Sequence, residues 1–146
     1  MTQASKVAIV TGAGSGIGRA ATLALVKDGF AVALAGRRKD ALDETARLAG
    51  GTTLVVPTDV AEVAQIRALF AAVKARFGRL DLLFNNAGIL GAIGPVAEIP
   101  GAEWSRTIDV LLSSVFYGIK HAARAMIAQG RGTDGSAGTI INTTST

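Results

Sequence analysis

The feature that most constrains the fold is a glycine-rich turn at residues 11–18, TGAGSGIG, which lies between an apolar run and a helix-like segment. The apolar run covers residues 7–10, and the helical pattern extends over residues 17–29. In a strand–turn–helix unit, the unpaired backbone N–H groups at the helix N-terminus and the positive end of its dipole favour anionic oxygens. The turn therefore predicts a diphosphate site, with a glycine-rich turn that binds nothing as the alternative.

The residues of this turn have separate expected roles. Gly12 permits the sharp turn, Gly16 leaves room where a pyrophosphate would approach, and Gly18 lets the helix lie close to the sheet. Ser15 and Ile17 stand beside these glycines and belong to the same predicted cofactor site. The spacing is TGxxxGxG, which differs in register from GxGxxG, so the glycines alone are a weak signal.

Apolar, β-branched runs alternate with helical patterns along the whole chain. The expected strands cover residues 7–10, 31–35, 53–56, 80–85 and 138–144, and the expected helices cover residues 17–29, 39–49, 62–77 and 103–129. This alternation predicts right-handed βαβ units and therefore a parallel sheet. We expect an α/β fold with a doubly wound parallel sheet, forming one dinucleotide-binding domain over residues 1–146.

Further motifs follow later strands of this expected sheet. Asp59-Val60 comes after the third strand, and Asn85-Asn86-Ala87-Gly88 follows the fourth. With the glycine turn before them and GTIINTTS at residues 138–145 after them, these motifs give a sequence that resembles the short-chain dehydrogenase/reductase family over essentially its whole length. The resemblance implies a Rossmann-like sheet of strand order 3-2-1-4-5, here without the family's C-terminal strands.

The resemblance also implies roles for these motifs. Asp59 would accept a hydrogen bond from the adenine amino group, while Val60 would pack on the ring. Residues 86–88 would line the ribose on the nicotinamide side, whereas Asn85 is expected to tie strands together. Asp59 has an alternative role as the N-cap of the helix that starts near Glu62, and the two roles are compatible.

The end of the second expected strand indicates which dinucleotide is bound. An acidic residue there would hydrogen-bond the ribose 2′-OH of NAD, but the sequence has Gly36 followed by Arg37 and Arg38. A guanidinium group can bind a phosphate through two hydrogen bonds. The sequence therefore favours NADP(H) over NAD(H), with Arg37 at the 2′-phosphate. The alternative is that both arginines simply begin an exposed helix.

Ser145 is the one catalytic candidate that the sequence offers. The resemblance implies that its hydroxyl holds the substrate oxygen while the tyrosine of a YxxxK motif exchanges a proton and hydride moves to or from the nicotinamide. The chain contains no YxxxK, since Tyr117 is followed by Lys120 at the third position and His121 at the fourth. Leu111 also stands where many family members have an asparagine that supports the proton relay.

These features support different classes of function. The leading interpretation is an NADP(H)-dependent oxidoreductase that interconverts an alcohol and a ketone or aldehyde. The chain would then be the N-terminal, cofactor-binding portion of a longer enzyme, inactive by itself. Leu111 and the missing YxxxK favour instead an inactive dinucleotide-binding pseudoenzyme or sensor. A remnant that is stable only in association with another chain is the third interpretation.

Composition argues against several other classes. The net charge of +4 comes from scattered basic residues without an aromatic platform, so we expect no nucleic-acid partner. The chain has no cysteine and no acidic or histidine set with metal-ligand spacing, so we expect no metal site. The absence of a signal-peptide pattern and of a long apolar span predicts a cytoplasmic protein without a membrane partner. The broad apolar face of the expected helix 103–129 predicts a homo-oligomer.

Overall fold

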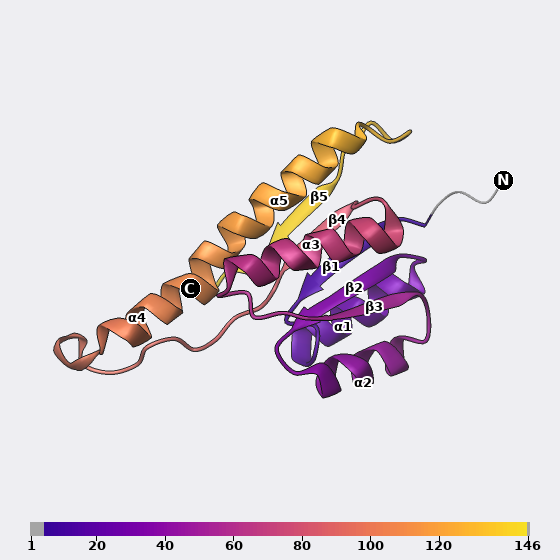
Figure 1. Ribbon diagram of the computed structural model, residues 1–146. Coiled ribbons are helices and arrows are strands. Elements are labelled where there is room, and N and C mark those ends of the chain that lie inside the picture. The colour runs from indigo at the N-terminus through magenta and orange to yellow at the C-terminus, as the bar shows by residue number, and fades with distance from the viewer. Residues whose placement is uncertain (1–4, 146) are drawn as a thin grey trace.

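The computed structural model describes residues 5–145, which form a parallel sheet with helices on both faces (Figure 1). The strands are β1 (Val7–Thr11), β2 (Ala31–Gly36), β3 (Thr53–Pro57), β4 (Leu82–Asn85) and β5 (Thr139–Asn142). They are hydrogen-bonded in the order β3-β2-β1-β4-β5, and every neighbouring pair is parallel. The doubly wound α/β fold and its strand order, expected from the sequence, are therefore confirmed.

The helical elements lie between the strands in the expected alternation. They are α1 (Gly16–Lys27), α2 (Lys39–Ala49), α3 (Val63–Phe77), the short 3-10 turn η1 (Val96–Glu98), α4 (Gly101–Ile108), the π-helical turn η2 (Asp109–Ser113) and α5 (Ser114–Gln129). Both α2 and α3 end at a glycine in the left-handed conformation, Gly50 with φ 65° and Gly78 with φ 74°. Glycine adopts this conformation without steric cost, so these two helix ends agree with the sequence prediction.

Alternate residues of each inner strand divide the core into two layers. On β1, Val7 and Ile9 pack with buried residues of α3 and α5, while Ala8 and Val10 pack toward α1 and α2. All four β1 residues are at most 2% exposed. A strand that is apolar on both faces is typical of a parallel sheet covered on two sides. The two layers hold the carboxyl ends of the strands in a fixed arrangement.

The predicted helix 103–129 is continuous but contains a π-helical turn. The turn η2 separates α4 from α5, and Ser114 Oγ at the start of α5 donates a hydrogen bond to the Val110 carbonyl of η2 at 2.6 Å. The π turn shifts the helical register, so that Val110 is buried while Leu111 and Leu112 remain exposed. α4 projects beyond the sheet (Figure 1). Among residues 5–145, no helix has the length and hydropathy needed to cross a membrane.

The fourth strand is shorter than predicted, and side chains bond to the two residues that precede it. The backbone N–H of Leu80 donates to Gln129 Oε1 at 3.1 Å, and the Gln129 amide donates back to the Leu80 carbonyl at 2.6 Å. The Asp81 carboxylate accepts hydrogen bonds from the Val7 backbone N–H at 2.8 Å and from Arg79. The backbone of Asp81 still bonds to both neighbouring strands: its N–H donates to the Val7 carbonyl, and its carbonyl accepts from the Thr139 N–H, both at 2.8 Å. β4 itself begins at Leu82.

Candidate functional site

The carboxyl ends of β1, β2, β3 and β4 border a groove of about 190 Å³. Residues predicted from the sequence contribute much of its lining: Gly12, Ser15, Arg37, Asp59, Val60, Ala87 and Gly88. The groove lies where the strand order of an open parallel sheet reverses, which is the usual ligand position in such folds. The fold therefore brings motifs that are distant in sequence to one site.

The glycines of the first turn are required for two different reasons. Gly12 has φ 65°, and a Cβ there would lie 3.0 Å from both Ala87 Cα and Asn86 Nδ2. A Cβ on Gly18 would overlap the Gly12 carbonyl oxygen. Gly16 has φ 51° and no atom within 4 Å of its ideal Cβ position. Gly12 and Gly18 thus allow close packing, while Gly16 leaves open space in front of α1.

The N-terminus of α1 retains its capacity to bind an anion. Its N-cap, Ser15, makes no side-chain capping hydrogen bond, and the first turn contains no acidic residue. The guanidinium of Arg19 donates to the Gly14 carbonyl at 2.7 Å and to Thr45 Oγ1 at 2.9 Å, so it fixes the glycine turn against α2. Open space at Gly16, free backbone donors and the positive end of a helix dipole fit the diphosphate of a dinucleotide.

Thr11 joins the first turn to the segment that follows β4. Its Oγ1 accepts hydrogen bonds from the backbone N–H groups of Asn86 and Ala87, both at 2.9 Å. The side-chain amide of Asn86 donates to the Thr11 carbonyl at 3.2 Å, so Asn86 lies behind the groove lining. Asn85 donates to Asn142 Oδ1 at 3.0 Å and ties β4 to β5, as the sequence predicted.

Asp59 forms a turn before α3 and does not cap that helix. Its Oδ1 accepts the Ala61 backbone N–H at 3.0 Å, whereas the N-cap position of α3 belongs to Glu62. The alternative role of Asp59 as an N-cap is therefore wrong, because the chain makes one more turn before the helix begins. The other oxygen, Oδ2, lies 3.5 Å from a guanidinium nitrogen of Arg106.

Several lining residues were not predicted from the sequence. Arg38 and Thr58 adjoin predicted residues, but Arg106 and Val110 enter the groove from α4 and η2. Their spacing of four residues on one helix face was the available signal. It could not be assigned to a site without knowing that this helix crosses the ends of the strands. Leu111 lies beside Gly88, 3.6 Å from the position of a Cβ there.

The remaining predicted residues lie outside the groove lining. Gly16 and Ile17 are exposed at the start of α1, and Gly18 is buried beneath the turn. Ser145 is exposed and follows β5. The chain just before it lies near the groove, since Thr143 Oγ1 is 3.4 Å from Asn86 Oδ1. Ser145 thus lies beyond the carboxyl end of β5, at the same edge of the sheet as the groove.

A larger hollow of about 780 Å³ lies at the opposite, amino-terminal ends of the strands. Its lining includes Lys6, Asp81, Gln129 and Asp134. Here the Asp81 carboxylate and the Gln129 amide are occupied by hydrogen bonds to the backbone. Ligands of open parallel sheets bind outside the carboxyl ends, so the smaller groove is the better candidate site.

Comparison with known proteins agrees with this assignment. A family model described as short chain dehydrogenase matches residues 6–146. The chain is 37% identical to a cyclohexanol dehydrogenase of Acinetobacter sp. (strain SE19), covering 97% of this chain and 55% of the relative. It is 35% identical to a 3beta-hydroxysteroid dehydrogenase of Mediterraneibacter gnavus, covering 96% and 49%.

A solved structure also matches closely. It is a metagenomic short-chain oxidoreductase in complex with NADP, which superimposes with a TM-score of 0.89 at 35% sequence identity. The match covers 98% of this chain and 64% of that one. The chain spans about half the length of the curated relatives it matches. The sheet order, the glycine turn and the match over residues 6–146 show that this chain belongs to the short-chain dehydrogenase family of oxidoreductases.

Proposed function

We propose that this chain carries the cofactor-binding part of an NADP(H)-dependent oxidoreductase that interconverts an alcohol and a ketone or aldehyde. The observation that carries the proposal is the pair Arg37 and Arg38 at the end of β2, on the same groove as the glycine turn. No acidic residue stands at the end of β2, where an NAD enzyme would bind the ribose 2′-OH. A neighbour with an NADP complex supports the same choice.

Each part of the groove has a distinct role in this proposal. The first turn of α1, from Ser15 to Gly18, holds the diphosphate, and Arg37 holds the 2′-phosphate. Asp59 and Val60 bind the adenine, and residues 86–88 flank the ribose on the nicotinamide side. The bound nicotinamide supplies or accepts the hydride. Ser145 holds the oxygen of the substrate alcohol or carbonyl by a hydrogen bond.

The cofactor preference is tested by titrating the protein with NADPH and NADH and following nicotinamide fluorescence. We expect NADPH to bind at least about tenfold more tightly than NADH, because one charge-assisted hydrogen bond to the 2′-phosphate contributes about that much affinity. Arg37→Ala removes this difference. Arg47→Ala leaves it unchanged, because Arg47 lies on α2, is paired with Glu44 and does not line the groove. Equal affinities of the unaltered protein for the two cofactors contradict the proposal.

A dinucleotide-binding pseudoenzyme or sensor is the second candidate, and Leu111 favours it. Leu111 replaces the asparagine expected from the family resemblance, and its side chain lies beside Gly88 near the nicotinamide end of the groove. Both candidates predict that the 146-residue chain binds NADPH without oxidising it when carbonyl compounds are added. Steady NADPH consumption that Ser145→Ala abolishes would refute this inactivity.

A further inference from the structure

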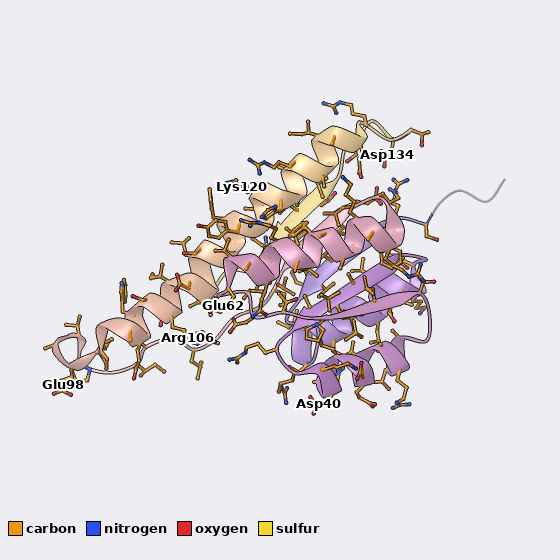
Figure 2. The ribbon with its side chains drawn as sticks, viewed as in Figure 1. Asp40, Glu62, Glu98, Arg106, Lys120 and Asp134 are labelled. Atoms are coloured by element: carbon orange, nitrogen blue, oxygen red, sulfur yellow. The ribbon has the colours of Figure 1, made fainter. Side chains whose placement is uncertain are left out.

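We propose that Arg106 is a positioning residue that orients the Asp59 carboxylate toward the 6-amino group of the adenine and so sets the base specificity of the cofactor site. This inference rests on the proposed function. It assigns a role to a residue on α4, which neither the glycine turn nor the strand-end motifs include. Figure 2 labels Arg106 on α4, and the start of α3 near Asp59 is marked by Glu62.

The contacts fix the Asp59 carboxylate from two sides. On one side the Ala61 backbone N–H donates to Oδ1 at 3.0 Å, within the turn that precedes α3. On the other side the Arg106 guanidinium lies 3.5 Å from Oδ2. The backbone N–H of Asp59 also donates to Gln65 Oε1 at 2.7 Å, which holds the turn itself. Each carboxylate oxygen keeps a further lone pair, which can accept a hydrogen bond from a ligand.

The charges around the groove identify Asp59 as the partner of Arg106. Among the groove-lining residues that the structure describes, Asp59 is the single carboxylate, while Arg37, Arg38 and Arg106 are cationic. Arg37 and Arg38 follow β2, whereas Arg106 comes from α4. Because the arginines come from different elements, we expect Arg37 and Arg38 to bind the phosphates and Arg106 to act through Asp59.

An ionised carboxylate discriminates between purines by its hydrogen-bonding chemistry. It only accepts hydrogen bonds, so it can pair with the 6-amino donor of adenine but not with the 6-oxo acceptor of hypoxanthine. The ion pair with Arg106 holds the carboxylate in a fixed direction. The pair is partly solvated, with the two side chains 44% and 24% exposed, so its effect is modest. Loss of Arg106 should weaken amino-group recognition by roughly threefold.

The test compares NADPH with reduced nicotinamide hypoxanthine dinucleotide phosphate, which has a 6-oxo group in place of the amino group. Fluorescence titrations give the ratio of the two dissociation constants for the unaltered protein and for Arg106→Gln, Arg106→Lys and Asp59→Asn. We expect the unaltered protein to prefer NADPH and Arg106→Gln to lose about two-thirds of that preference, with partial rescue by lysine. In the Asp59→Asn background, adding Arg106→Gln should change the ratio no further.

Arg124→Gln is the control, because Arg124 lies on α5 and does not line the groove. Thermal unfolding followed by circular dichroism verifies that each variant is folded. Equal weakening of both dinucleotides by Arg106→Gln would mean that Arg106 acts on the phosphates, and an unchanged ratio would mean that it has no role; either result overturns the inference but not the proposed function. If the unaltered protein binds neither dinucleotide, the proposed function fails as well.

Discussion

At the scale of single residues, two glycines of the first turn differ in role: Gly18 is needed for packing, and Gly16 leaves space for a ligand. Gly18 cannot carry a side chain because of the Gly12 carbonyl, so its role is fixed by the fold alone. Gly16 has no such neighbour, although its φ of 51° disfavours other residues. The space in front of Gly16 is therefore available to the diphosphate of the proposed cofactor. Substitution at Gly16 should therefore affect binding more than stability.

Gly16→Ala should weaken NADPH binding by at least roughly tenfold while costing about 1–2 kcal/mol of unfolding free energy. The methyl group would enter the space proposed for the diphosphate, and the stability loss would reflect the left-handed backbone. Gly50→Ala is a matched control, because Gly50 also has a left-handed φ, 65°, and open surroundings but lies at the C-terminal end of α2 and not in the glycine turn. Fluorescence titration and urea unfolding measure the two effects. Similar NADPH affinities for both variants would contradict the role of Gly16.

Asp81 should stabilise the protein in a pH-dependent manner. Burial alone would raise the pKa of this carboxyl. The hydrogen bonds from Arg79 and from the Val7 backbone N–H together lower it by more, so the pKa lies below its ordinary value. Its contribution is therefore present above the unfolded pKa of about 4 and is lost as the pH falls through the folded value. Asp81→Asn should cost about 1–2 kcal/mol at pH 7.

Urea unfolding of the protein and of Asp81→Asn at pH 7 and at pH 3 measures this contribution. The difference between them should shrink at the lower pH. Asp43→Asn is the control, because the Asp43–Lys39 pair is exposed and should contribute little. A difference between the protein and Asp81→Asn that stays the same at both pH values would show that the charge of Asp81 is not responsible.

At the scale of elements, the sequence predicted the sheet well and the long helix less completely. Strands such as β1 and β2 are apolar at nearly every position, so the pattern predicts that they exist, whereas their order came from the family resemblance. The π turn η2 has no such signature in the sequence, and Val110 within it is buried beside the groove. The same tertiary placement brings Arg106 to Asp59, and a linear sequence does not reveal it.

Thr11 provides a test of how the first and fourth strand ends are held together. Thr11→Val keeps the side-chain shape but removes the oxygen that accepts from the Asn86 and Ala87 backbone N–H groups. Leaving partly buried donors without a partner should cost about 1–3 kcal/mol and weaken NADPH binding, because residues 86–88 would shift. Thr22→Val, which removes a bond only within α1, is the control. Unfolding and NADPH-binding measurements compare the two variants. If Thr11→Val has no greater effect than Thr22→Val, Thr11 does not hold these strand ends together.

At the scale of the whole molecule, one side of the described chain remains uncovered. Leu112 and Phe116 are 62% and 61% exposed on η2 and α5. Ile141 of β5 is 45% exposed on the other face of the sheet, since its neighbour Ile140 packs with the core layer of α3 and α5. β5 is also an edge strand among the described residues. Exposed apolar side chains on adjacent elements are typical of a surface that another polypeptide covers. This surface supports the predicted homo-oligomer through the helix 103–129.

Phe116→Glu should dissociate that assembly, because a charge would be buried in an apolar interface. Sedimentation velocity should show an oligomer for the unaltered protein and a smaller species for the variant at the same concentration. Leu48→Glu, at a 44% exposed position on α2, should leave the oligomer intact. A monomeric unaltered protein, or identical sedimentation of all three proteins, would contradict the prediction.

The most direct test of the central claim, that the groove at the carboxyl ends of the strands binds NADP(H), is an NMR titration of the 15N-labelled protein. Backbone amide shifts recorded with increasing NADPH locate the site residue by residue. We predict saturable changes at Gly12, Ser15, Arg37, Asp59 and Gly88. Changes confined to the hollow at the amino-terminal ends of the strands, or none at all, would contradict the account.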